Sequence, residues 1–538
     1  MKNRVFYDWV SPKLDLFLLL VINICLAFTS GISSSLQSYM AGSQSSIPAD
    51  VTMASYAYLA GMACVFPFIV RLRQLVNTRM ILVTVFLSLI LINFILSQTD
   101  QPLIMVMGSF AEGCVKLVGS IEIISALFPI LMPNGERYQV YAVYYPVSLI
   151  FSPVSAMCTV WFANLVNWQF GFHFSNLLLF IGLLIVLILV HPRFPGRKVP
   201  FRQFDWLGLI LLAASMLLGE FVLVYGQTED WWKSAHIQAA AIFGILAFVL
   251  FLQRTLRLKR PVASFELFTN RYVYVGLSLL FILCMFYSTT APQNVLQNIM
   301  LKNDPVKTTE ISLYAIPGYI LGSLFCLFYY RKFSNFKVVI AIACGCYILS
   351  AAMMYFLVSN ATGAQDLFVP MVFRGMGIII SYISVGIYVA GNAPAKFMQS
   401  VPFFLIAIRS FVGPLMWGSL FTNWLYTGQI RNIDRIAVDM DMLNPAVTAR
   451  YEPLVKAAAA KGMSISQAAN NATQQIFKPV QSQASLLAVR EIYGVVVVAG
   501  LILLVAILFF SFETGSRKGM LKWRNPFRIK ELAQAVPV

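Results

Sequence analysis

Six ionisable side chains lie within long apolar stretches of the chain rather than at their ends. They are Glu112, Lys116, Glu122, Glu220, Arg374 and Arg409. A helix of about 20 apolar residues crosses a bilayer core, and a charge at that depth costs at least about 2.5–3.5 kcal/mol. Each of the six groups should therefore face a cavity or a charged partner. Groups that are dry in one state and wet in another take up and release protons, so these six are the first functional candidates.

Three of these groups share one predicted helix. Glu112 and Lys116 are four residues apart, about 40° around the helix, which favours an ion pair near mid-depth. Glu122 lies about 80° to the other side and nearer the cytoplasm. We predict that Glu112 and Glu122 are proton-linked acids, with Lys116 as their cationic partner. The alternative is a static Glu112–Lys116 pair, with Glu122 only reaching the cytoplasmic interface.

The composition indicates the elements that must hold these groups. Of the 538 residues, 59% are apolar and 11% are charged, whereas globular domains carry about 25% charged residues. This excludes a soluble enzyme and predicts an all-α integral membrane protein. About fourteen runs are long enough to span a bilayer: 14–36, 54–72, 79–98, 102–127, 139–164, 170–190, 205–226, 236–254, 272–298, 311–330, 337–358, 367–391, 400–427 and 488–513.

The net charge of +17 arises mainly from basic residues in the loops between these runs. Alternate loops are rich in Lys and Arg, whereas the short loops between them hold only Lys233, Lys302 and Lys307. Because basic residues stay on the cytoplasmic side, we predict cytoplasmic N- and C-termini in the cell (inner) membrane, with a basic tail at 514–538. The excess charge is thus a topology signal and not a nucleic-acid site.

One predicted external segment, 428–487, is long and polar. Asn444-Pro445 favours the start of a helix, and Lys456 to Gly462 favours its end. We interpret the segment as a solvated helical cap, with a docking surface or an external gate as the alternative. The eight cysteines all lie in apolar runs, so we expect packing roles and neither a disulfide framework nor a metal site.

Several motifs resemble the fourteen-span drug–proton antiporters of the major facilitator superfamily, the EmrB/QacA type. The clearest stretches are Phe204–Leu209, Tyr225–Gln227 with Asp230-Trp231, and Pro261 with Phe265–Phe268 and Asn270-Arg271. Weaker matches surround them at Trp168, Phe170, Asn176, Pro292, Gln297, Pro305 and Pro317. The resemblance covers almost the whole chain.

The resemblance implies a domain plan. Residues 1–200 would form a six-helix half, 201–260 two inserted helices, and 261–513 a second six-helix half that includes segment 428–487. The energy source would be the proton gradient, without a cofactor or metal. Relatives in Gram-negative bacteria work with a periplasmic adaptor and an outer-membrane channel, so these are the expected partners, beside the substrate, protons and lipid.

The transport motifs of this family are only partly present. The antiporter motif of the fifth span reads Ser152–Met157, in which Pro153 and Ser155 still allow a kink and close helix approach. Pro414 follows Gly413 at the corresponding place in the other half. Arg71 and Arg73 remain in the stretch that latches the cytoplasmic side in the family. The first-span Asp and the fourth-span Arg of the family have no counterpart here.

The ninth span is unusually polar. In the superfamily the corresponding helix lines the central cavity, so the resemblance makes Tyr287, Thr289, Thr290, Gln293 and Asn294 cavity candidates; interhelical hydrogen bonds are the alternative. Arg374 and Arg409 match family arginines that position helices or contact substrate. Glu220 falls in a predicted inserted helix, where we expect a structural partner.

Together these features favour a proton-coupled exporter of small amphipathic organic compounds. Three alternatives stay open: an exporter of an endogenous metabolite such as a siderophore or lipid-like compound, a solute importer, and a transport-inactive membrane scaffold. The sequence lacks a Walker A, zincin or Ser-His-Asp pattern, and its three histidines lie near predicted membrane edges, so we do not expect an enzyme.

Overall fold

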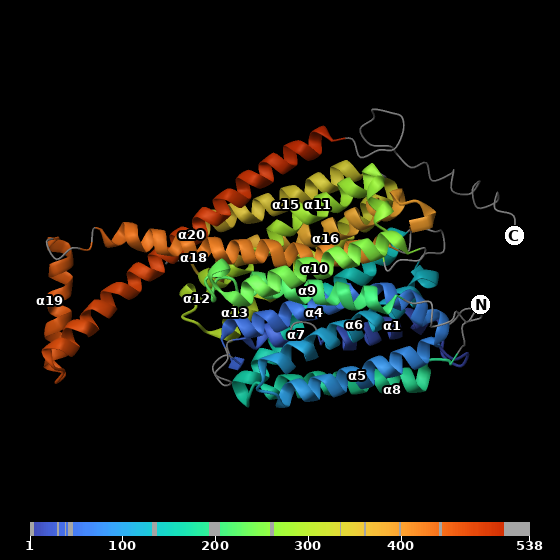
Figure 1. Cartoon of the computed structure of the whole chain (residues 1–538), viewed down its shortest axis with the longest axis horizontal. Coiled ribbons are helices and arrows are strands. Elements are labelled where there is room, and N and C mark those ends of the chain that lie inside the picture. The colour runs from blue at the N-terminus through green and yellow to red at the C-terminus, as the bar shows by residue number, and fades with distance from the viewer. Residues whose placement is uncertain are drawn as a thin grey trace.

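The computed structural model describes residues 5–29, 32–37, 39–40, 47–131, 137–192, 205–258, 263–333, 335–359, 362–397, 400–438, 440 and 444–510. Within these ranges the regular elements are helices (Figure 1). The described residues also contain one isolated antiparallel bridge, between Phe6 and Val190. Thirteen helical stretches in this part of the chain are long and apolar enough to cross a membrane. The chain is therefore a multi-pass membrane protein.

The first helices match the predicted spans, with one exception. They are η1 (Pro12–Leu14), α1 (Asp15–Ala27), α2 (Ile32–Ser35), α4 (Pro48–Leu75), α5 (Thr78–Gln98), α6 (Pro102–Leu131), α7 (Arg137–Leu165) and α8 (Gln169–Leu189). The exception is the predicted span 14–36, of which the structure describes two shorter helices, α1 and α2; residues 30–31 between them lie outside the described residues. The fourteenth span thus remains a prediction.

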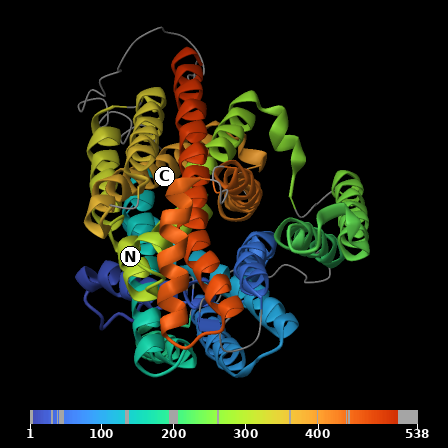
Figure 2. The same ribbon diagram turned by 90° about the vertical axis from the view of Figure 1, so that its left-hand side faces the viewer.

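The predicted inserted pair consists of α9 (Trp206–Tyr225) and α10 (Ala235–Arg257), with η3 (Trp231–Lys233) between them. The two helices pack against each other, and α9 contacts α4 and α18 (Gly413–Ala437). Figure 2 shows the pair, in green, on one side of the molecule. This position agrees with an insertion between two halves, and the division of the chain into domains stays a prediction.

The following helices are more broken than predicted. They are η4 (Phe265–Thr269), α11 (Arg271–Tyr287), α12 (Thr290–Met300), α13 (Pro305–Leu313), α14 (Ile316–Lys332), α15 (Phe336–Leu357), η5 (Ala364–Leu367) and α16 (Phe368–Asn392). The ninth span is interrupted at Ser288 and Thr289, whose hydroxyls donate to the carbonyls of Cys284 and Phe286. The tenth is interrupted before Pro317, because a proline is best accommodated in the first turn of a new helix.

The C-terminal helices are longer than predicted. After η6 (Ala395–Phe397), α17 (Val401–Ile406) continues through a π-helical turn, η7 (Ala407–Val412), into α18; then follow α19 (Pro445–Ala460) and α20 (Ile465–Phe509). The predicted ends at 427 and 488 are wrong as helix ends, since α18 runs to Ala437 and α20 begins at Ile465. Figure 1 shows these extensions projecting from the bundle, with α19 at their far end. The helix predicted after Asn444 is confirmed as α19.

Two helix pairs approach each other so closely that only glycine fits between them. A Cβ at Gly113 of α6 would lie 1.9 Å from the Tyr58 carbonyl oxygen of α4, and one at Gly61 of α4 would lie 2.1 Å from that of Phe110. Gly318 of α14 and Gly375 of α16 show the same reciprocal contact, at 2.1 Å and 2.5 Å from carbonyls. Small residues allow such approach in membrane helices. These contacts fix the positions of α6 and α16, the helices that carry Glu112 and Arg374.

Several basic residues lie at one end of the bundle. Lys396 pairs with Glu266, Arg254 with Asp205, and the Asn270 side chain donates to the Asn392 carbonyl. The bridge between Phe6 and Val190 lies at this end too, and Figure 1 shows α18, α19 and α20 extending beyond the other end. We call it the basic end; it carries the arginines near the ends of α4, α7, α10 and α14, namely Arg73, Arg137, Arg254 and Arg331.

Candidate central cavity

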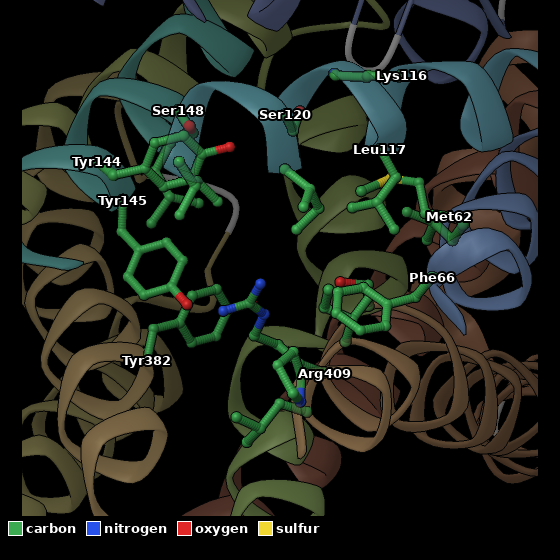
Figure 3. A pocket seen from close by; sticks show the side chains of 18 of the residues that line it. Met62, Phe66, Lys116, Leu117, Ser120, Tyr144, Tyr145, Ser148, Tyr382 and Arg409 are labelled. Carbon is green, nitrogen blue, oxygen red and sulfur yellow. The ribbon is translucent and has the colours of Figure 1, made fainter. Parts of the chain in front are cut away.

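A cavity of about 790 Å³ lies between helices from the beginning and the end of the chain. Its walls come from α1, α4, α6 and α7 on one side and from α11, α16, α17, η7 and α18 on the other (Figure 3). This volume suits a small organic molecule, since ligand cavities commonly measure about 300–1,000 Å³. The site predicted to lie in the membrane interior is thus a real cavity between the two groups of helices.

The cavity extends to the basic end of the bundle. Its lining includes Arg73, near the end of α4, Arg137, the first residue of α7, Ala390, near the end of α16, and Val401, the first residue of α17. At the opposite end of α4, which begins at Pro48, the first lining residue is Ser55. The described chain is therefore in a state whose cavity faces the basic end.

Glu112 and Lys116 both line this cavity. Glu112 is 3% exposed and Lys116 is 6% exposed, so both ionisable side chains are almost completely buried in the cavity wall. The Lys116 ammonium lies 5.4 Å from the centre of the Tyr58 ring, a cation–π distance. The Glu112 Oε1 atom has no hydrogen-bond partner among the described residues. A buried carboxyl oxygen without a hydrogen-bond partner costs free energy, which is reduced when the oxygen binds a proton or accepts a hydrogen bond from a molecule in the cavity.

Glu122, the second predicted proton-linked acid, is placed differently. Its carboxylate pairs with Arg73 at 2.7 Å and accepts a hydrogen bond from Thr78 at 3.2 Å. Glu122 is not among the residues that line the cavity, and its partners come from the end of α4 and the start of α5. The two acids thus lie in different surroundings, and a proton-linked role of either one stays a prediction. Glu122 joins three helices at the basic end, whereas the side chain of Arg71 lies outside the described part of the chain.

Arg409 enters the cavity from the π-helical turn η7. Its guanidinium carbon lies 4.5 Å from the centre of the Tyr382 ring and 4.9 Å from that of Tyr145, an arrangement visible in Figure 3. Pro414 is the second residue of the next helix, α18. Because a proline has no N–H and its ring collides with the carbonyl four residues earlier, a widened turn forms just before this helix. The Pro414 carbonyl accepts a hydrogen bond from Tyr56 at 3.3 Å.

Of the polar residues predicted in the ninth span, Tyr287 lines the cavity. Its hydroxyl donates to the Arg409 carbonyl at 2.5 Å. Thr289 and Gln293 are buried elsewhere, and Thr290 and Asn294 are exposed, because the break after Tyr287 turns α12 away from the cavity. The prediction of these four as cavity residues is not matched by their positions.

Arg374 is also absent from the cavity lining. Its guanidinium donates to the Gln293 side chain and, at 2.6 Å, to the Tyr287 carbonyl. It thereby closes the break between α11 and α12, where the helix cannot satisfy its own carbonyl groups. Arg374 thus links α16 to the break in the ninth span, and both roles predicted for it stay predictions.

The remaining predicted positions contribute to packing. Pro153 lies inside α7, and the Ser155 hydroxyl donates to the Phe28 carbonyl at 2.6 Å, which holds α7 close to the end of α1. Glu220 on α9 is fully buried against α4, where the backbone of Ala57 approaches its carboxyl group. None of the ion pairs of the described residues involves Glu220, so a charged partner is not seen there.

Apart from Tyr287, the tyrosines of the cavity were not predicted from the sequence, and neither was Arg137. Seven tyrosines line it: Tyr56, Tyr58, Tyr141, Tyr144, Tyr145, Tyr287 and Tyr382. Three of the seven follow a helical i, i+3, i+4 spacing on α7, which was the available signal. Arg137 was read only as a loop charge, although it is the first residue of α7.

No family model matches the chain. Among curated proteins it is 27% identical over 124 residues to a trichothecene efflux pump of Trichoderma arundinaceum, covering 21% of each chain. It is 25% identical over 200 residues to an MFS-type efflux pump of Fusarium, covering 31% of this chain and 35% of the relative. The matched region thus spans about a fifth to a third of these relatives.

Solved structures match over nearly the whole chain. A POT family transporter in complex with 5-aminolevulinic acid has a TM-score of 0.59 at 13% identity, covering 93% of this chain and 97% of its own. The nucleoside transporter NupG has a TM-score of 0.54 at 14% identity, covering 92% and 99%. These relatives are named as transporters or pumps and not as enzymes. The chain therefore has the fold of these transporters.

Proposed function

We propose that this chain is a secondary active transporter that exports small amphipathic organic compounds in exchange for protons. The observation that carries the proposal is the central cavity, which holds Glu112 and Lys116 in a dry wall between two groups of helices. The similarity to efflux pumps, although it covers only part of the chain, supports the outward direction. The finer assignment to the fourteen-span drug–proton antiporters rests on the sequence motifs.

The geometry supports a simple exchange cycle. When the cavity faces the basic end, which we propose is cytoplasmic, substrate enters from that side and competes with the proton for the Glu112 region. Opening to the other side then wets Glu112, the substrate leaves, and a proton binds. Such a cycle needs a carboxyl group whose hydration changes between the two states, and we propose that Glu112, which lines the cavity, is this group. The proposed location is the cell (inner) membrane, with both termini cytoplasmic.

The extended helices are the proposed contact for a periplasmic adaptor. The extension is held together by an Arg431–Glu491 ion pair and by a hydrogen bond of 3.2 Å from Gln429 to Ser485. These contacts join α18 to α20, and α19 packs on α20. A paired-helix arm that stands beyond the bundle suits contact with another protein better than it suits a cap over the cavity.

The proposal is tested with the full chain in proteoliposomes and a panel of amphipathic compounds. With an imposed proton gradient, we expect concentrative transport of at least one compound, and we expect a protonophore to abolish it. Transport that persists after the gradient is collapsed would contradict proton coupling. Absence of flux for the whole panel, with the fold intact by circular dichroism, would favour the scaffold alternative. Preference for a siderophore or fatty-acid-like compound over drugs would favour export of an endogenous metabolite.

A further inference from the structure

The charges that line the central cavity are unbalanced. Four basic residues, Arg73, Lys116, Arg137 and Arg409, line it together with one acidic residue, Glu112. Arg73 is paired with Glu122 outside the lining, and Lys116 lies one helical turn from Glu112. Counting these two pairs as neutral, the lining retains the charge of Arg409, which takes part in none of the ion pairs of the described residues. The wall of the cavity is thus net positive.

Arg409 lies within the aromatic part of this wall. Its guanidinium contacts the rings of Tyr145 and Tyr382, and none of the ion pairs in the described part of the chain involves it. Ring faces hold the guanidinium in place and offset part of its desolvation. They do not neutralise it, so the planar N–H groups remain suited to an incoming oxyanion.

The surroundings of Arg409 fit a molecule that has both a charged and an apolar part. Met62 and Phe66 from α4 and Leu117 from α6 line the same cavity, and Figure 3 shows them across from Tyr145 and Tyr382. An apolar body can lie against these side chains while its charged group meets Arg409. The distribution of polar and apolar groups is that of a site for one amphipathic molecule.

We infer that the central cavity selects amphipathic organic anions, with a carboxylate or sulfonate held by Arg409 between Tyr145 and Tyr382. The inference rests on the proposed transport function and names its substrate class. An organic cation is disfavoured, because it would bring a further positive charge beside Arg409 and Arg137 at low dielectric. Arg137, at the basic end, adds attraction along the entrance.

The test compares two fluorescent probes of nearly the same skeleton, 1-anilinonaphthalene-8-sulfonate and the neutral N-phenyl-1-naphthylamine. Binding to the full chain in nanodiscs is measured without a proton gradient, and empty nanodiscs give the lipid background. We expect saturable binding of the sulfonate at least about tenfold tighter than that of the neutral probe. Equal affinity for the two probes would overturn the inference.

Variants of Arg409 connect the preference to this residue. We expect Arg409→Gln to weaken binding of the sulfonate about tenfold and to leave binding of the neutral probe within about twofold. Arg409→Lys should keep part of the preference, since it keeps the charge without the planar donor array. The matched control is Arg435→Gln, an exposed arginine on α18 outside the cavity lining.

Each outcome of the variants supports or overturns the role of Arg409 in binding the anion. Unchanged sulfonate binding by a folded Arg409→Gln variant would overturn the role of Arg409. If that variant does not fold, the comparison of the two probes on the wild-type chain and on Arg409→Lys still decides. Because binding needs no gradient, a failure of proton coupling leaves this test intact. Transport of organic cations alone would contradict the anion selectivity while leaving the proposed export function in place.

Discussion

At the scale of single residues, two acids of one helix have different surroundings. Glu112 faces the central cavity with a carboxyl oxygen that lacks a partner in the described chain, whereas Glu122 is paired with Arg73 and Thr78. The spacing of the two on α6 predicted different faces, but the sequence could not show that Arg73, from another helix, reaches Glu122. Long-range partners depend on packing and leave no local pattern.

The Arg73–Glu122 pair gives a prediction for stability. Glu122 is 2% exposed and Arg73 is 41% exposed, so removal of the arginine leaves a buried carboxylate uncompensated while water screens part of the cost. We expect Arg73→Gln to destabilise the folded chain by about 1–3 kcal/mol. We expect Arg73→Gln with Glu122→Gln to recover part of this loss, because the buried charge is then absent. Thermal unfolding in detergent of the wild type, the two single variants and the double variant completes this double-mutant cycle.

A matched single variant controls this cycle. Arg435→Gln removes an exposed arginine of α18 and should change the unfolding midpoint little. Strict additivity of the Arg73 and Glu122 substitutions would show that the pair contributes no coupling, and the proposed joint between α4, α5 and α6 would be wrong.

At the scale of elements, composition and periodicity predicted most helices and missed their interruptions. Runs of about 20 apolar residues predict a span, but not the break at Ser288 and Thr289, where side-chain hydroxyls compete for backbone carbonyls. This break explains why Thr290 and Asn294 are exposed. Likewise, polarity after residue 427 suggested the end of a helix, although α18 continues to Ala437 as part of a helical arm outside the predicted bilayer region.

The contact between α4 and α6 gives a prediction at this scale. Gly113→Ala would place a methyl group 1.9 Å from a backbone carbonyl oxygen, so the helices must separate. We expect a destabilisation of at least about 1–3 kcal/mol and reduced transport, since α6 carries Glu112 and Lys116. The measurements are the unfolding midpoint and the flux in proteoliposomes.

Gly219→Ala is the matched control for this contact. An added Cβ there meets nothing within 4 Å, and alanine favours a helix over glycine by about 0.5–1 kcal/mol. The control should therefore be as stable as the wild type or more so. Equal stability of Gly113→Ala and Gly219→Ala would contradict the close packing of α4 and α6.

At the scale of the whole molecule, the charge distribution and the helix count were the informative signals. The surplus of basic residues predicted a cytoplasmic end, which stays a prediction, and the cavity extends to the end of the bundle where Arg73 and Arg137 lie. The cavity itself was predicted only through the resemblance, because its tyrosines come from α4, α7, α11 and α16, and no sequence spacing joins residues of four helices. Two groups of helices around one cavity are the arrangement that alternating access requires.

The most direct test of proton-coupled exchange at Glu112 follows the internal pH of proteoliposomes with a trapped dye. A transported compound from the panel is supplied on one side, and the wild-type chain is compared with Glu112→Gln and with the exposed-site control Glu310→Gln. We predict that substrate moves protons in the wild type and the control, and that Glu112→Gln loses this movement by more than about tenfold while it still binds the compound. Wild-type proton movement by a folded Glu112→Gln chain would contradict the central role of Glu112.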